Sequence, residues 1–201
     1  MDLLDFTMHI KAGNWRRYYQ RTQSANYQAV KDMVCNSFDQ KCAYCGYASD
    51  KNNLVNKNFD YHDNSKNNIV PACTLCTPCV VMDGFGQDPA FGGVIVFIPE
   101  FTQIQINHLV RALYASSEKN ATYHSRLNEI FLSFEERKEY VEKIFGKNSF
   151  QIEYFAQGLL DIFIDSKKLQ HPIFKNLRFL PDKAKLKNEI PDFVRTYFHT
   201  N

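Results

Sequence analysis

The chain of 201 residues carries 24 basic and 22 acidic side chains, which give a formal net charge of +2 at pH 7. This near-neutral charge lacks the strong positive field of many nucleic-acid-binding domains, so no nucleic-acid partner is expected. The sequence is 44% hydrophobic, but no apolar run approaches the roughly 18 residues of a membrane span. The opening residues also lack the basic and apolar regions of a signal peptide, and we therefore expect a cytoplasmic protein.

The length is sufficient to bury a hydrophobic core and predicts a single domain over residues 1–201. Within it the composition changes along the chain. Residues 41–93 are rich in glycine, proline and asparagine, whereas amphipathic helical patterns dominate after residue 98. We expect residues 1–98 to form a zinc-centred part and residues 99–201 to form a helical part.

The first 40 residues predict two short extended segments followed by a helix. Residues 8–12 alternate weakly as in a strand, Gly13-Asn14 is a turn signal, and residues 15–19 should form a second extended piece. From Ser24 onward, apolar residues recur at helical spacing, which predicts a helix that ends before Lys41. The residues that carry this spacing are Tyr27, Val30, Met33, Val34 and Phe38.

The second half begins with a strand signal and continues with helices. Residues 94–98 are apolar, rich in β-branched side chains and bounded by glycine and proline, which predicts a buried strand. Thr102 and Gln105 match a capping box at the start of a helix. Amphipathic stretches predict further helices over about 122–145, 149–164 and 182–198, with Gly146 and Pro181 as boundaries.

Four of the six cysteines form two pairs that each enclose two residues, Cys42 with Cys45 and Cys73 with Cys76. In a reducing cytoplasm, clustered cysteines are metal ligands more often than disulfides. Two such pairs complete the tetrahedral four-thiolate shell of a structural zinc site, which leaves no open position for a substrate or a catalytic water. The sequence therefore predicts one structural Zn²⁺.

The other two cysteines have weaker claims to the metal. Cys79 follows Cys76 by three residues, and the spacing leaves open whether it replaces one of the four ligands. Cys35 falls near the end of a predicted helix and is expected to be a small core residue.

Residues 59–73 resemble the HNH endonuclease pattern, in which a strand with an Asp or His and the general-base His leads to an Asn and a second cysteine pair. Asp60, His62 and Asn68 are the residues of these types here. Thr77 stands where active enzymes carry a metal-binding His, and without that metal nothing stabilises the charge on the phosphate. We therefore expect no catalytic residue and no enzyme, with a metal-dependent nuclease and a zinc-containing nucleic-acid-binding module as alternatives. Asn68 is expected to tie the loop to neighbouring backbone.

Five segments, taken together in their order and spacing, resemble the IcmJ/DotN family of the Dot/Icm type IVB secretion system. The match runs nearly end to end. The segments are Gly13-Asn14-Trp15-Arg16, residues 42–47, residues 73–79, residues 98–103 and residues 174–181.

The resemblance implies an α+β fold, an HNH-endonuclease-like treble-clef zinc fold elaborated with a C-terminal helical layer. It implies an adaptor of the type IV coupling complex that binds the C-terminal tail of the coupling ATPase DotL and supports effector recruitment. The subunits IcmS, IcmW and LvgA would be indirect partners. The chain would then be cytoplasmic and peripheral to the inner membrane through this complex.

Overall fold

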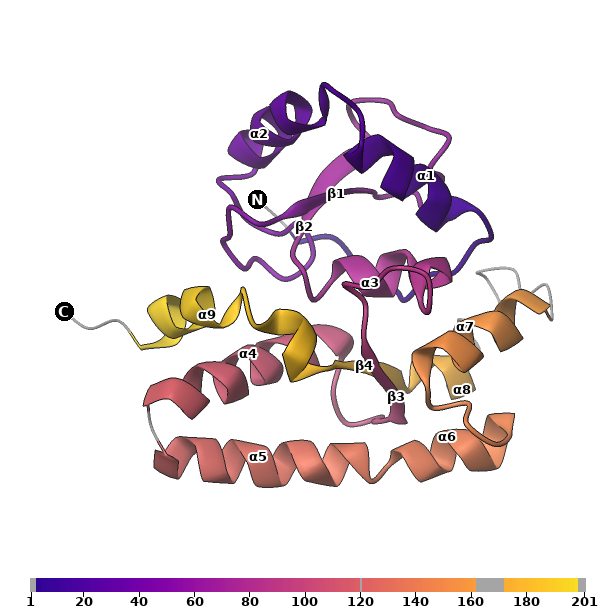
Figure 1. The fold of residues 1–201 in the computed structure, drawn as a ribbon, viewed down its shortest axis with the longest axis vertical. Helices are drawn as coiled ribbons and strands as arrows, with labels where there is room; N and C mark the ends of the chain where they lie inside the picture. Colours follow the sequence, from indigo (N-terminus) through magenta and orange to yellow (C-terminus); the bar gives the residue numbers. More distant parts are fainter. Residues whose placement is uncertain (1–2, 120, 162–171, 199–201) are drawn as a thin grey trace.

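The computed structural model describes residues 3–119, 121–161 and 172–198. Within these described residues, helices combine with two two-stranded antiparallel sheets, so the expected α+β class is confirmed. In Figure 1, the elements up to α3 lie at the top, α5 and α6 run end to end along the bottom, and β3, β4, α4 and α9 lie between them. The helices are α1 (Asn14–Thr22), α2 (Tyr27–Ser37), α3 (Thr77–Val80), α4 (Gln103–Lys119), α5 (Ala121–Glu135), α6 (Lys138–Phe145), α7 (Ile152–Asp161), α8 (Pro172–Lys175) and α9 (Ile190–Tyr197), with 3-10 turns η1 (Met82–Gly84) and η3 (Lys183–Leu186).

The prediction of extended structure before residue 20 is wrong. Residues 14–22 form α1, and no strand forms over residues 8–12. The N–H of Trp15 in the first turn of α1 donates to the carboxylate of Asp83 at 2.8 Å. This capping acceptor satisfies a free helix amide from a position 68 residues away, so no local pattern could reveal it.

A hairpin and a short helix follow α2, whose predicted position is confirmed. Strand β1 (Asn53–Asn56) pairs antiparallel with β2 (Ile69–Ala72), and α3 begins soon afterwards. Residues 59–62 therefore belong to the connection between the strands, and not to a strand as in the HNH pattern. The Asn68 amide donates to the Asp63 carbonyl at 2.8 Å and accepts from the Asn58 N–H at 3.0 Å, which confirms its expected loop-tying role.

The predicted strand at residues 94–98 is confirmed as β3 (Gly93–Phe97), and its partner is a strand that the sequence did not predict. This partner is β4 (Leu177–Pro181), which pairs antiparallel with Ile95 opposite Phe179. A Cβ on Gly93 would lie 2.1 Å from the Leu180 carbonyl oxygen, so the pairing requires glycine at its first position. A strand of five residues that ends in proline gives too weak a local signal to predict.

The helical layer confirms some boundaries and corrects others. The Thr102 N–H donates to the Gln105 side chain at 2.8 Å and the Gln105 N–H donates to the Thr102 hydroxyl at 3.2 Å, as the capping box predicts. The helix predicted over 122–145 is two helices, α5 and α6. Between them the N–H groups of Arg137 and Tyr140 take acceptors three residues back, which tightens the chain and interrupts the α-helical ladder.

The last two predicted helices begin later than expected. The helix predicted from residue 149 begins at Ile152 as α7, and its predicted end at residues 162–164 lies outside the described residues. The second is η3 followed by α9, because the Asp182 side chain caps η3 and Pro191, which lacks an N–H, stands in the first turn of α9. None of the described helices is both long enough and apolar enough to cross a membrane.

The largest apolar cluster joins the two parts of the chain. It includes Tyr44 from the cysteine-bearing segment, Val110 and Leu113 from α4, and Phe193 from α9. The rings of Tyr47 and Phe193 meet edge to face with centroids 5.8 Å apart. The C-terminal helices thus pack directly against the segment that carries the cysteine pairs.

Candidate metal centre

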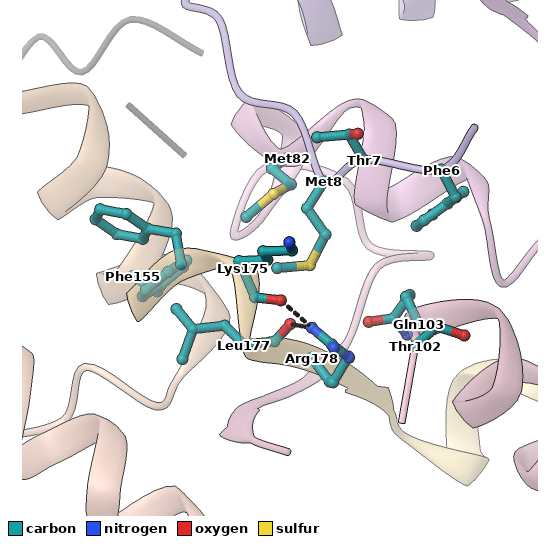
Figure 2. Close-up of a pocket in the computed structure, with 11 residues that line it drawn as sticks. Phe6, Thr7, Met8, Met82, Thr102, Gln103, Phe155, Lys175, Leu177 and Arg178 are labelled. Carbon is teal, nitrogen blue, oxygen red and sulfur yellow. Dashed lines mark hydrogen bonds between the residues drawn. The ribbon is translucent and has the colours of Figure 1, made fainter. Parts of the chain in front are cut away.

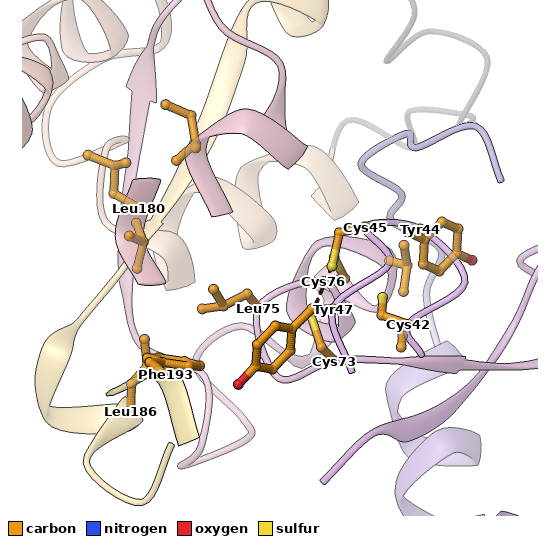
Figure 3. Close-up of a cluster of buried hydrophobic side chains, with 14 of the residues drawn as sticks. Cys42, Tyr44, Cys45, Tyr47, Cys73, Leu75, Cys76, Leu180, Leu186 and Phe193 are labelled. Carbon is orange, nitrogen blue, oxygen red and sulfur yellow. Dashed lines mark hydrogen bonds between the residues drawn. The ribbon is translucent and has the colours of Figure 1, made fainter. Parts of the chain in front are cut away.

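The sulfur atoms of Cys42, Cys45, Cys73 and Cys76 form a compact, buried group. All four Sγ atoms lie within 4.8 Å of one another, and those of Cys45 and Cys73 are 3.6 Å apart. Zn–S bonds of about 2.3 Å in a tetrahedron place sulfur atoms about 3.8 Å apart, so the group has the size of a four-thiolate metal site. Figure 3 shows the four side chains together, with Tyr47 on the side that faces Phe193. The structure brings together all four residues predicted from the spacing.

Backbone hydrogen bonds fix the two cysteine turns. The Gly46 N–H donates to the Cys42 carbonyl at 2.9 Å, and Gly46 adopts a φ of +70°, a conformation that glycine supplies at little cost. The Cys76 N–H donates to the Cys73 carbonyl at 3.0 Å in the turn that leads into α3. The Ala43 N–H donates to the Pro71 carbonyl at 2.8 Å, which joins the first turn to strand β2.

Cys79 and Cys35 lie outside the group of four sulfur atoms. The Cys79 thiol faces the Leu75 carbonyl at 3.7 Å and packs in a different apolar cluster, where burial raises the pKa of the thiol well above its usual value. Cys35 is buried with Leu54 and Ile69, as expected of a core cysteine.

The residues of the HNH pattern are engaged in contacts of their own. The Thr77 hydroxyl is buried and lies 3.0 Å from the Cys73 carbonyl oxygen, within donating distance. His62 is exposed, and its Nε2 accepts from Arg17 Nε at 2.9 Å. Asp60 accepts from the N–H of His62 at 3.0 Å and lies 3.8 Å from Lys11 Nζ. These contacts account for each side chain without a second metal ion.

Two polar residues of α4 contact the sulfur atoms, and sequence reasoning missed both. Asn107 Nδ2 donates to Cys76 Sγ at 3.3 Å. Arg111 Nη2 donates to Cys73 Sγ at 2.9 Å and to Cys45 Sγ at 3.2 Å. A signal was present, because these residues lie four apart beside the apolar stripe of a helix, and polar groups on a buried face require partners.

Arg111 is fully buried and charged. Its guanidinium lies over the Tyr47 ring at 4.2 Å, a cation–π contact that covers one face of the charge. Burial by itself would lower the pKa of Arg111, but Cys73, Cys45 and Cys76 outweigh burial and raise it above its usual value. The guanidinium is therefore a permanent cation next to the thiol group.

Comparison with known proteins adds an identity to this geometry. No family model matches the chain. It is 30% identical over 179 residues to the type 4 apparatus protein DotN of Legionella pneumophila, and the match covers 89% of this chain and 84% of the relative. The chain belongs to the IcmJ/DotN family. The family assignment places it among the proteins of the Dot/Icm type IV secretion system.

This IcmJ/DotN member also has an apolar pocket at the edge of β4. A hollow of about 450 Å³ lies between the N-terminal segment, α7 and β4, with Phe6, Met8 and Phe155 in its lining (Figure 2). The guanidinium of Arg178, on the wall of the pocket, is already hydrogen-bonded to the backbone. Its Nη1 donates to the carbonyls of Lys175 at 2.7 Å and Leu177 at 2.6 Å. Its described lining contains no His, Cys, Asp or Glu, so it offers no acid–base pair.

Proposed function

We propose that the chain is a zinc-stabilised adaptor subunit of the type IVB coupling complex. It binds the C-terminal tail of the coupling ATPase DotL and supports effector recruitment, with IcmS, IcmW and LvgA as indirect partners at the cytoplasmic side of the inner membrane. The observation that carries this proposal is the relationship to DotN over 89% of the chain.

A single structural zinc ion is the metal that best fits the cysteine group. Four thiolates favour Zn²⁺ and complete its tetrahedral shell, and all four cysteines are buried. We propose Cys42, Cys45, Cys73 and Cys76 as its ligands. A closed shell leaves no coordination position for a substrate, which favours a role in folding over a role in catalysis.

The arrangement around the cysteines supports an HNH-like treble-clef fold. A cysteine turn precedes the β1–β2 hairpin, and the second cysteine pair leads from the hairpin into α3. Thr77 stands at the start of α3 with its hydroxyl held by backbone carbonyls. We propose a scaffold of the nuclease type that serves in binding, because its metal-binding His is replaced and its loop residues are engaged elsewhere.

The test is native mass spectrometry of the purified chain, alone and mixed with the C-terminal tail of the coupling ATPase. A scrambled peptide of the same composition is the control for the tail. We expect one zinc ion per chain and a one-to-one complex with the tail only. A zinc-loaded chain that does not bind the tail would overturn the adaptor role. Two metal ions per chain together with divalent-dependent DNA nicking would favour the nuclease.

A further inference from the structure

Three polar side chains form a buried ladder along one face of α4. Gln103, Asn107 and Arg111 lie four residues apart, which places them one above another on the helix, and all three are buried. Gln103 Nε2 donates to Asn107 Oδ1 at 3.0 Å, and Asn107 Nδ2 in turn donates to Cys76 Sγ. With the two N–H···S bonds of Arg111, three of the four sulfur atoms receive a hydrogen bond from α4.

When the metal is bound, the positive charge of Arg111 in this ladder has an electrostatic role. Four thiolates and one divalent ion leave two net negative charges in a buried site, and burying unpaired charge is costly. Arg111 carries the positive charge that touches the group, and no carboxylate forms an ion pair with it among the residues that the structure describes. The thiolates are therefore its counter-charge, and a guanidinium buried without them would be unpaired.

The other end of the ladder reaches the second sheet. The Gln103 amide donates to the Phe179 carbonyl at 2.8 Å and accepts from the Phe179 N–H at 2.8 Å. It thereby satisfies both backbone groups of a β4 residue in the way that a neighbouring strand would. A continuous set of hydrogen bonds thus connects Cys76, through Asn107 and Gln103, to strand β4.

We propose that Arg111 and Asn107 are positioning residues of the metal centre. Arg111 is its counter-cation, and both side chains hold the thiolates through N–H···S hydrogen bonds, so metal retention and the docking of α4 depend on each other. This inference rests on the proposed zinc site and is independent of the proposed DotL contact.

The test compares variants of the full chain by competition with a chromogenic zinc chelator. Arg111→Met removes the charge and keeps much of the volume, and we expect about 10–100-fold weaker zinc retention, the usual effect of losing a partner of metal ligands. Arg111→Lys keeps the charge but loses the planar guanidinium that places Nη2 against both sulfur atoms, and it should fall between this variant and the wild type. Asn107→Leu should weaken retention less, because it removes one neutral donor.

Arg137→Met is the matched control for the substitution. Arg137 is a partly exposed arginine between α5 and α6 that pairs with Glu100 at 2.6 Å, far along the chain from the cysteines. Arg137→Met also removes a guanidinium, but one that does not contact a sulfur atom. Its zinc retention should therefore equal that of the wild type.

A spectroscopic measurement separates direct positioning from a general loss of packing. In the Co²⁺-substituted chain, thiolate-to-cobalt charge transfer becomes easier when positive charge and hydrogen bonds are removed from sulfur. We expect this absorption band to move to lower energy in Arg111→Met, and to move less in Arg111→Lys and Asn107→Leu. If Arg111→Met does not fold, the latter two variants decide the question by the same band.

Two results would overturn the proposal. Unchanged zinc retention and an unchanged cobalt band in the folded Arg111 and Asn107 variants would show that the ladder only fills the core. A wild-type chain that holds no metal would overturn the zinc assignment together with this inference. Failure of the tail complex alone would leave the inference standing.

Discussion

The cysteine-bearing segment and the α4–α9 pair are built by different means. In the first, strands β1 and β2 and helix α3 have four residues each, which is too short for stability on their own. In the second, α4 has 17 residues and packs Val110 and Leu113 in the same core as the fully buried Phe193 of α9. The comparison supports the proposed metal site as what organises the first region, whereas apolar burial organises the second.

The largest expected effect comes from removing one proposed ligand. Cys73→Ser should abolish zinc binding and unfold residues 41–80, because a structural zinc ion contributes on the order of 10 kcal/mol to folding. Metal content by mass spectrometry and hydrogen exchange across this segment would measure the effect. Cys79→Ser is the control, since Cys79 is equally buried but lies outside the sulfur group. Normal zinc content and normal melting in Cys73→Ser would contradict the assignment.

A substitution in the apolar region should destabilise the chain and spare the metal. Phe193→Ala removes a fully buried ring that meets Tyr47, and such truncations cost about 3–5 kcal/mol. Thermal unfolding should show a lower melting temperature, with zinc still bound to the folded chain. Tyr154→Ala, at a ring that is 57% exposed on α7, should change stability by less than about 0.5 kcal/mol. Loss of zinc from the folded Phe193→Ala variant would contradict the division between the regions.

The sequence predicted those features whose signals are local. The two cysteine spacings, the capping box at Thr102 and the apolar run of β3 each depend on residues within a few positions of one another, and each has the predicted position in the structure. The features that the sequence analysis did not predict depend on residues far apart in the chain. Helix α1 has its capping carboxylate 68 residues away at Asp83, and Arg111 meets Cys73 across 38 residues. Strand β4 likewise depends on its pairing with β3 and on the side chain of Gln103.

The pH dependence of stability tests the long-range cap at α1. Burial raises the pKa of Asp83 to about 6, while backbone hydrogen bonds at the start of α1, including that of Trp15, act to lower it. A carboxyl group whose pKa is higher in the folded chain than in the unfolded chain binds its proton more tightly when folded. Its contribution to stability is therefore fully present at low pH and is lost as the pH rises through about 6.

Asp83→Asn removes this titration and keeps a capping oxygen. Between pH 7 and pH 5, the wild type should gain about 1 kcal/mol of unfolding free energy relative to the variant, as measured by urea denaturation at each pH. Release of zinc at low pH affects both chains alike and cancels in the difference. A constant difference across this range would mean that Asp83 does not titrate in it.

The smallest effect is expected at His62, in the loop that resembles a nuclease. The side chain is exposed, and its hydrogen bond with Arg17 joins two exposed groups. His62→Ala should therefore change stability by less than about 0.5 kcal/mol and leave zinc content unchanged. Binding of the coupling-ATPase tail, measured by titration calorimetry, should also stay at the wild-type value. Gln28→Ala on the exposed face of α2 serves as a surface control. Loss of tail binding in His62→Ala alone would show that the nuclease-like loop is the docking site.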